Sequence, residues 1–133
     1  MYDAIGCGIG ILDEATEGKV GAKAILVIMT DGQENASCEF SHEKISGLLK
    51  ARQEQGWLVT FLGEGLEVSR QGTNLGTYAG SVAAYAGGAG LRAAGRVLAA
   101  SSLRYVKAGG DIRGTQAKAA VTPEERDALA GKK

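Results

Sequence analysis

The oxygen-bearing side chains with the clearest arrangement follow one apolar run, in the segment ILVIMTDGQENAS over residues 25–37. Asp31 stands where the apolar run ends, and Gly32 allows the backbone to turn sharply behind it. Glu34 and Asn35 add further oxygen atoms close by. Groups that offer only oxygen favour a hard cation such as magnesium. An aspartate at the end of a strand also commonly forms a turn or caps a helix, so both interpretations of Asp31 stay open.

Other combinations of reactive side chains are incomplete. Cys38 and His42 have a C-x-x-x-H spacing, but zinc needs three or four ligands and the only other cysteine is Cys7. A serine-based triad through Ser37 or Ser41 lacks the nucleophile-elbow motif. The glycines of GCGIG fall one residue short of the dinucleotide-binding spacing, and no strand precedes them. We therefore predict that the chain is not an enzyme, with a small α/β enzyme of uncharacterised type as an alternative.

Two apolar runs separated by an amphipathic helix are the elements that must position these residues. AILVIM over 24–29 and WLVTFL over 57–62 are typical of strands that are buried on both faces of a parallel sheet. Between them, Ser41 caps a predicted helix over 42–55. Strand, helix and strand make one right-handed crossover unit. Asp31 then lies at the carboxyl edge of the sheet, where open α/β folds bind ligands.

The flanking segments extend this α/β pattern. The further predicted elements are, in chain order, a helix over 2–15, a short helix over 68–73, a short strand over 77–79 and the longest helix, over 89–107. Thr122 followed by Pro123 predicts a short terminal helix. We expect one partial domain over 1–110, followed over 111–133 by a flexible linker and that terminal helix.

Composition limits the classes of partner. The 133 residues carry 15 lysines and arginines and 15 aspartates and glutamates, so no net field favours nucleic acid or an anionic membrane. No run approaches the roughly 20 apolar residues of a membrane helix, and the first residues lack the basic stretch of a signal peptide. The 2 cysteines do not make a disulfide framework. We expect a cytoplasmic chain with neither a nucleic-acid nor a membrane partner.

The order of the segments resembles the second half of a von Willebrand factor A (vWA) domain. MYDAIG, the strand that ends in TDGQEN, SHEKISGLLKARQEQGW and LVTFLG follow one another as in that family, most closely as in its small bacterial and phage members. The resemblance is good over roughly residues 2–62 and looser beyond them. It implies a partial Rossmann-like, vWA-type three-layer sandwich with a short, mainly parallel sheet and a long C-terminal helix.

The resemblance also implies a particular kind of site. In vWA domains, an Asp-x-Ser-x-Ser motif, a threonine and the aspartate of T-D-G form a metal-ion-dependent adhesion site, and of these the chain has only Asp31. A protein-interaction module with an incomplete adhesion site is therefore expected, without a cofactor unless a partner chain completes a magnesium site. The expected contact residues for an unidentified protein partner are Glu34, Asn35, Ser37 and His42.

The predicted strand over 24–29 also bears on assembly. In a complete vWA domain this strand has a neighbour on each side, whereas the sequence supplies only 57–62. Neither charge nor proline blocks the other edge, whose residues include Ala24, Leu26, Val27 and Ile28. We expect this edge to join another chain, most simply a second copy with two-fold symmetry. A structural subunit that oligomerises through the edge is thus an alternative to the adhesion-type module.

Overall fold

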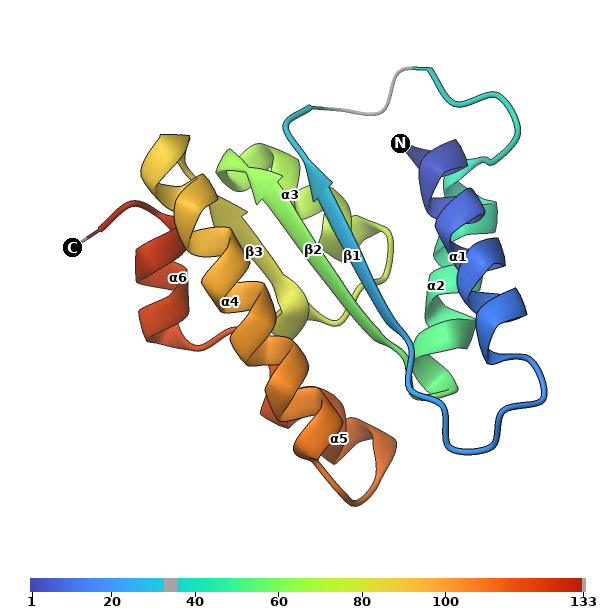
Figure 1. Cartoon of the computed structure of the whole chain (residues 1–133). Coiled ribbons are helices and arrows are strands. Elements are labelled where there is room, and N and C mark those ends of the chain that lie inside the picture. The colour runs from blue at the N-terminus through green and yellow to red at the C-terminus, as the bar shows by residue number, and fades with distance from the viewer. Residues whose placement is uncertain (33–35, 133) are drawn as a thin grey trace.

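The computed structural model describes residues 1–32 and 36–132, in which helices and strands alternate (Figure 1). In chain order the elements are α1 (Tyr2–Thr16), β1 (Ile25–Thr30), α2 (His42–Glu54), β2 (Leu58–Glu64), α3 (Gly65–Asn74), the 3-10 turn η1 (Ala79–Ser81), β3 (Val82–Tyr85), α4 (Gly87–Lys107), α5 (Ile112–Ala119) and α6 (Pro123–Leu129). This order is that of an α/β fold.

Within the described residues, the strands form one parallel sheet in the order β1-β2-β3. Ile25 lies opposite Leu58 in the first pair, and Phe61 lies opposite Val82 in the second. The central strand β2 is buried from Leu58 to Gly63. The parallel pairing of β1 with β2, joined through α2, confirms the crossover unit that the two apolar runs predict.

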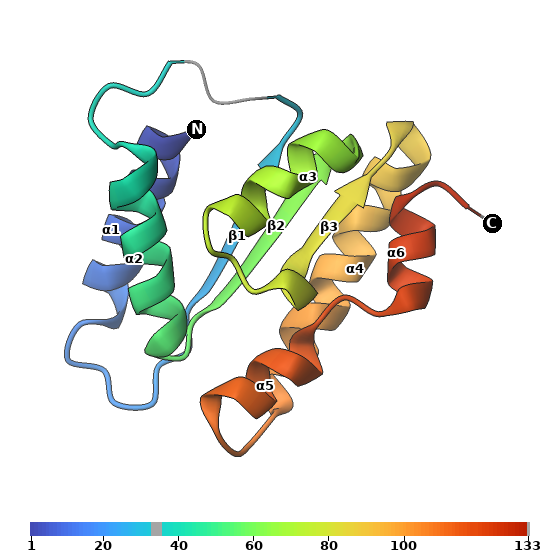
Figure 2. The same ribbon diagram turned by 180° about the vertical axis from the view of Figure 1, so that it is seen from behind.

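Helices cover both faces of the sheet (Figures 1 and 2). On one face lie α1, α2 and α3, and there Phe61 of β2 packs with Ile45 and Leu49 of α2. On the other face lie α4, α5 and α6, and there Leu62 of β2 packs with Val97 of α4. The molecule is thus a three-layer sandwich, a partial Rossmann-like fold with a long helix in its C-terminal half.

The remaining predicted helices are confirmed with small shifts of their ends, but the predicted strand over 77–79 is wrong. The Tyr78 N–H donates to the Gln53 side-chain oxygen at 2.8 Å, and the Tyr78 carbonyl accepts the Ser81 N–H at 2.8 Å. The bond between Ser81 and Tyr78 closes a turn, and the bond to Gln53 attaches this turn to α2, so the backbone joins the sheet only from Val82 onward.

The structure also differs from the flexible linker expected after residue 110. The Asp111 side chain accepts the Gly114 N–H at 2.7 Å and so caps α5. Ala119 at the end of α5 is fully buried, and its carbonyl accepts the Ser101 hydroxyl of α4 at 2.6 Å. The segment is therefore a packed helix.

No helix of the described ranges, α4 included, is both long enough and apolar enough to cross a membrane.

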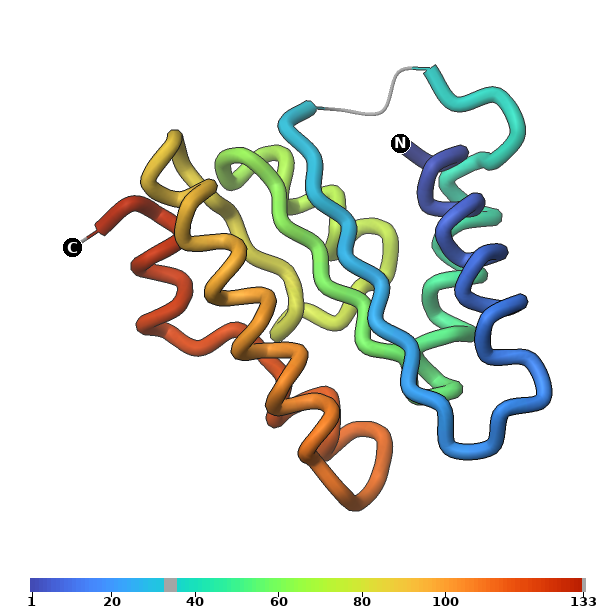
Figure 3. Tube along the Cα trace, in the orientation of Figure 1, coloured from blue at the N-terminus to red at the C-terminus, as the bar shows by residue number. Residues whose placement is uncertain are grey.

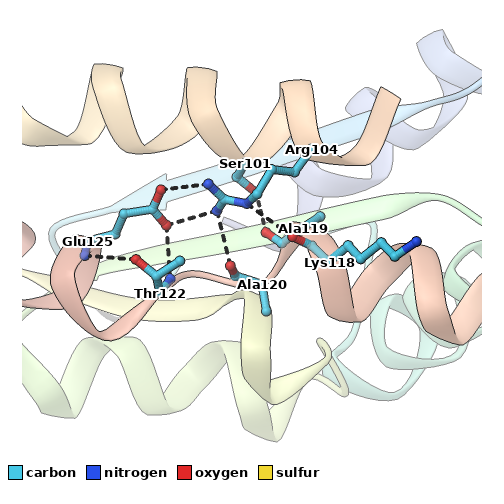
Figure 4. Close-up of polar contacts among 7 residues, drawn as sticks. All are labelled: Ser101, Arg104, Lys118, Ala119, Ala120, Thr122 and Glu125. Carbon is cyan, nitrogen blue, oxygen red and sulfur yellow. Dashed lines mark hydrogen bonds and ion pairs between the residues drawn. The ribbon is translucent and has the colours of Figure 1, made fainter. Parts of the chain in front are cut away.

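Arg104 of α4 ties the two terminal helices to the sandwich (Figure 4). Its guanidinium group donates to both carboxylate oxygens of Glu125, at 2.8 and 2.9 Å. It also donates to the carbonyls of Lys118 at 3.0 Å and Ala120 at 3.1 Å. Glu125 in turn accepts the Thr122 N–H at 2.9 Å, within the capping box that begins α6.

The environment of Glu125 makes part of the stability depend on pH. Burial raises the pKa of Glu125, but hydrogen bonds from Arg104 and Thr122 and the charge of Arg104 outweigh it, and the pKa lies below its ordinary value. A carboxyl whose pKa is depressed on folding stabilises the native state above its unfolded-state pKa. That contribution is lost as the pH falls through the folded-state pKa.

Glu125→Gln is expected to lower the free energy of unfolding at pH 7 by about 1–2 kcal/mol, because it removes charge-assisted hydrogen bonds. The variant should also lose less stability than the native chain between pH 7 and about pH 3. Urea unfolding followed by Trp57 fluorescence measures both effects. Glu124→Gln, an exposed neighbour in the same helix, is the matched control. An unchanged pH dependence in Glu125→Gln would show that the ion pair contributes nothing.

Candidate functional site

Asp31 lies directly after β1, in a turn that Thr30 closes. The Thr30 hydroxyl accepts the Gly32 N–H at 3.2 Å and donates to the Gly32 carbonyl at 3.1 Å. Gln71 of α3 donates to the same carbonyl at 3.4 Å. Asp31 itself is exposed. The threonine of T-D-G therefore builds the turn, and the aspartate is left available at its tip.

Two further polar side chains end the neighbouring strands at this edge of the sheet. Glu64 ends β2 and Tyr85 ends β3. Burial raises the pKa of Tyr85, and the negative charges of Glu64 and Asp31 raise it further. The three residues thus make an acidic edge that includes a protonated phenol at neutral pH. A phenol in that state donates a hydrogen bond but is not a nucleophile.

Asp3 is a polar residue whose role sequence reasoning misses. Its carboxylate accepts the backbone N–H groups of Cys38 at 2.8 Å, Glu39 at 3.0 Å and Phe40 at 2.9 Å. The Ser37 hydroxyl accepts the Asp3 N–H at 3.1 Å. An acid in the first turn of a helix is a common signal of N-terminal capping. Nothing local in the sequence indicates that its partners lie 35 to 37 residues away.

The residues expected to contact a partner fall at different places. Ser37 is held at the start of α1, and the His42 ring meets the Tyr2 ring edge to face, with 5.9 Å between centroids. Glu34 and Asn35 lie outside the described residues. The structure therefore brings Ser37 and His42 to the beginning of α1, whereas Asp31 follows the end of β1.

A groove of about 370 Å³ lies between the first turn of α1 and β1, and it reaches Asp31. It is lined by Met1, Ala4 and Ile5 on the α1 side and by residues 26–32 on the β1 side. Asp31 and Gly32 form the polar end of the groove. The start of α1 and the end of β1 thus belong to one surface.

The backbone along this groove has hydrogen-bonding groups on its outer side. The Ala24 carbonyl accepts the Leu58 N–H at 3.0 Å, and alternate residues of a strand direct their N–H and C=O groups to the same side. Leu26 and Ile28 therefore pair with β2, as Ala24 does. The outward groups are those of Ile25, Val27 and Met29.

Only Val27, among the edge residues singled out in the sequence, thus presents its backbone to the outside. Ala24 and Ile28 are buried, and Leu26 packs against the core beside α1. Val27 and Met29 each keep 40% of their surface exposed. The prediction that this strand is buried on both faces is therefore wrong for β1, although it holds for β2. In the part of the chain that the structure describes, β1 pairs with β2 alone.

The described residues contain no group of three or more histidine, cysteine, aspartate or glutamate side chains placed to hold a metal ion. Cys7 and Cys38 are free thiols and both are exposed. Asp31 is therefore the one adhesion-type ligand that the sequence and the described structure offer. A single carboxylate chelates magnesium weakly, because that ion needs several well-placed oxygens and loses its water reluctantly.

Comparison with known proteins adds no relative to this picture: no family model, curated protein or solved structure matches the chain. The resemblance to vWA domains rests on the sequence motifs alone.

Titration of the chain with magnesium or manganese is expected to show no site tighter than about millimolar, since one carboxylate gives little chelation. Isothermal calorimetry provides the measurement, with Asp31→Ala as the comparison. A micromolar affinity that disappears in Asp31→Ala would overturn this expectation.

Asp3→Asn is expected to destabilise the protein by about 1–3 kcal/mol, because a charged acceptor of backbone N–H groups is lost. Amide hydrogen exchange at Cys38, Glu39 and Phe40 should accelerate. Asp31→Asn serves as the control, since it removes a carboxylate at the far end of the same connection. Unchanged exchange at the three amides in Asp3→Asn would show that the carboxylate does not hold this segment.

Proposed function

We propose that the chain is a non-catalytic protein-interaction module that binds another polypeptide along the outer edge of β1. One observation carries the proposal: the backbone groups of Val27 and Met29 face outward from an apolar strand whose only described neighbour is β2. An open, apolar strand edge is a template for pairing with another chain, and soluble proteins normally block it. Strand addition at such an edge is a recurrent mode of peptide recognition.

The groove beside β1 supports the same function. Ala4 and Ile5 of α1 provide an apolar wall for the side chains of a strand that pairs with β1. Asp31 lies at the end of this groove, where a partner that supplies oxygen ligands of its own could share a cation with it. This would be the adhesion-type contact that the vWA resemblance implies.

The polar groups of the described site favour binding over catalysis. The acidic edge of Asp31, Glu64 and Tyr85 combines two carboxylates with a phenol whose pKa is raised, and the histidine lies elsewhere, against Tyr2. Hydrolytic and transfer reactions need a nucleophile next to a proton acceptor. Assembly of copies of the chain through the same edge is the second candidate function, and it rests on the same exposed backbone.

Val27→Lys is expected to abolish association at the edge, because it places a charge in the middle of the strand that pairs. The fold should survive with at most about 1 kcal/mol of destabilisation, since the Val27 side chain is 40% exposed. Light scattering at micromolar concentration measures self-association, and affinity selection from displayed random peptides measures binding of other chains.

Leu103→Lys is the matched control, since Leu103 is an exposed apolar residue of α4, 56% accessible and away from β1. Association that disappears in Val27→Lys and persists in Leu103→Lys is the expected result. A chain that stays monomeric and selects no peptide dependent on Val27 would refute the proposed function.

A further inference from the structure

A cleft of about 530 Å³ opens at the end of the sheet where the strands begin, away from Asp31. The connections that follow α1, α2 and α4 come together at this end (Figures 1 and 3). They line the cleft with Lys19 and Lys23, with residues 55–57, and with residues 108–110. A cavity of this size lies within the range of about 300–1,000 Å³ that small-molecule sites occupy.

The cleft offers hydrogen-bond donors that have no partner. Lys19 lines it and is exposed, and its ammonium group pairs with no carboxylate of the described residues. The N–H groups of Gly109 and Gly110 likewise donate to no described backbone group. An ammonium group and a backbone N–H are both donors, so together they suit a ligand that supplies acceptor oxygens.

The charge of the lining has one sign. Two lysines line the cleft, and no acidic side chain of the described residues does. Glu17 and Asp111 are close in the chain but are not part of the lining. The Asp111 side chain instead caps α5, where it accepts the Gly114 N–H at 2.7 Å. A concave site lined by positive charge alone attracts an anion.

Lys23 removes an opposing effect of α4. The carbonyl groups at the C-terminus of a helix carry partial negative charge, which disfavours an anion nearby. The Lys23 ammonium group donates to three carbonyls at this helix end, at 3.0 Å to Tyr105 and 3.1 Å each to Val106 and Ala108. These carbonyls therefore have a cation on them, and the end of α4 no longer opposes an anion in the cleft.

Apolar side chains complete the lining. Trp57 and Tyr105 lie in it and are otherwise buried, and Ile112 of α5 is 41% exposed. The Tyr105 hydroxyl donates to the Gly56 carbonyl, so it contributes its ring to the cleft and its polar atom to the fold. A ligand that fills the cleft thus needs an apolar body as well as an anionic group.

We infer that this cleft binds a small organic anion through a carboxylate or phosphate group. Lys19 supplies the charge, and Gly109 and Gly110 supply backbone donors. The apolar body of the ligand lies against Ile112 and Trp57. The site contains no residue of β1, so the inference is independent of the proposed function.

The test titrates the full chain with phenyl phosphate and with benzoate, which share an aromatic body and differ in the acid. Benzyl alcohol and benzylamine, of similar size, are the neutral and cationic controls. Amide shifts of Gly109 and Gly110 report on the donors, and the fluorescence of Trp57, the 1 tryptophan of the chain, reports on the apolar wall. At least one of the anions is expected to bind with a Kd of about 1 mM or tighter, and both controls at least about tenfold more weakly.

Two pairs of variants locate the site. Lys19→Gln should weaken binding of the anion at least about fivefold, whereas Lys44→Gln, which removes the same charge from a lysine beside Phe40, should not. Gly109→Pro removes one N–H donor and should weaken binding at least about threefold, whereas Gly109→Ala keeps that donor and the affinity. Ala108, with φ −70° and ψ 132°, has the conformation that a following proline requires, and a Cβ at Gly109 meets no atom within 4 Å.

Circular dichroism verifies that each variant is folded, and Lys19→Gln alone decides if the proline variant is not. Three results would each overturn the inference. The first is the absence of a saturable response to either anion at about ten times the expected Kd. The second is equal binding of benzyl alcohol, which would show a merely apolar cavity. The third is equal loss of affinity in Lys19→Gln and Lys44→Gln, which would show an effect of net charge alone.

Discussion

The structure depends on the burial of β2 between two strands and two layers of helices. Phe61 and Leu62, on opposite faces of this strand, are both fully buried. Burial of such side chains contributes about 1.5–3 kcal/mol each. A parallel strand reaches this state only when it has a neighbour on each side and helices above and below. β2 meets all of these conditions. Within the described residues, β1 pairs with β2 alone, and helices cover one of its faces only in part.

The parts of the fold that the sequence predicts well are those whose signal is local. The apolar runs at β1 and β2, the Ser41 cap and the Thr122-Pro123 start of α6 each specify an element through neighbouring residues. The strand Val82–Tyr85 escaped prediction because it is only 4 residues long and follows a turn fixed by Gln53, a distant residue. The helix α5 was missed because Ala119 becomes a core residue only when α4 lies against it.

The candidate site also has features that the sequence predicts and features that only the structure shows. The position of Asp31 directly after β1 follows from the motif and the apolar run. The role of Asp3 does not, since its carboxylate acts on backbone groups of a segment far along the chain. The outward direction of Val27 and Met29, as opposed to Leu26 and Ile28, requires the register between β1 and β2, which the sequence alone does not specify. A one-residue slip would exchange the two sets.

Amide hydrogen exchange along β1 of the free chain is the most direct test of the open edge on which the proposed function rests. The N–H groups of Leu26 and Ile28 are committed to β2, and those of Val27 and Met29 point outward. We predict that Val27 and Met29 exchange at least about a hundredfold faster than Leu26 and Ile28 in the dilute monomer, because only the latter pair needs the sheet to open. Equal protection of all four amides in a monomer would contradict an open edge and, with it, binding along β1.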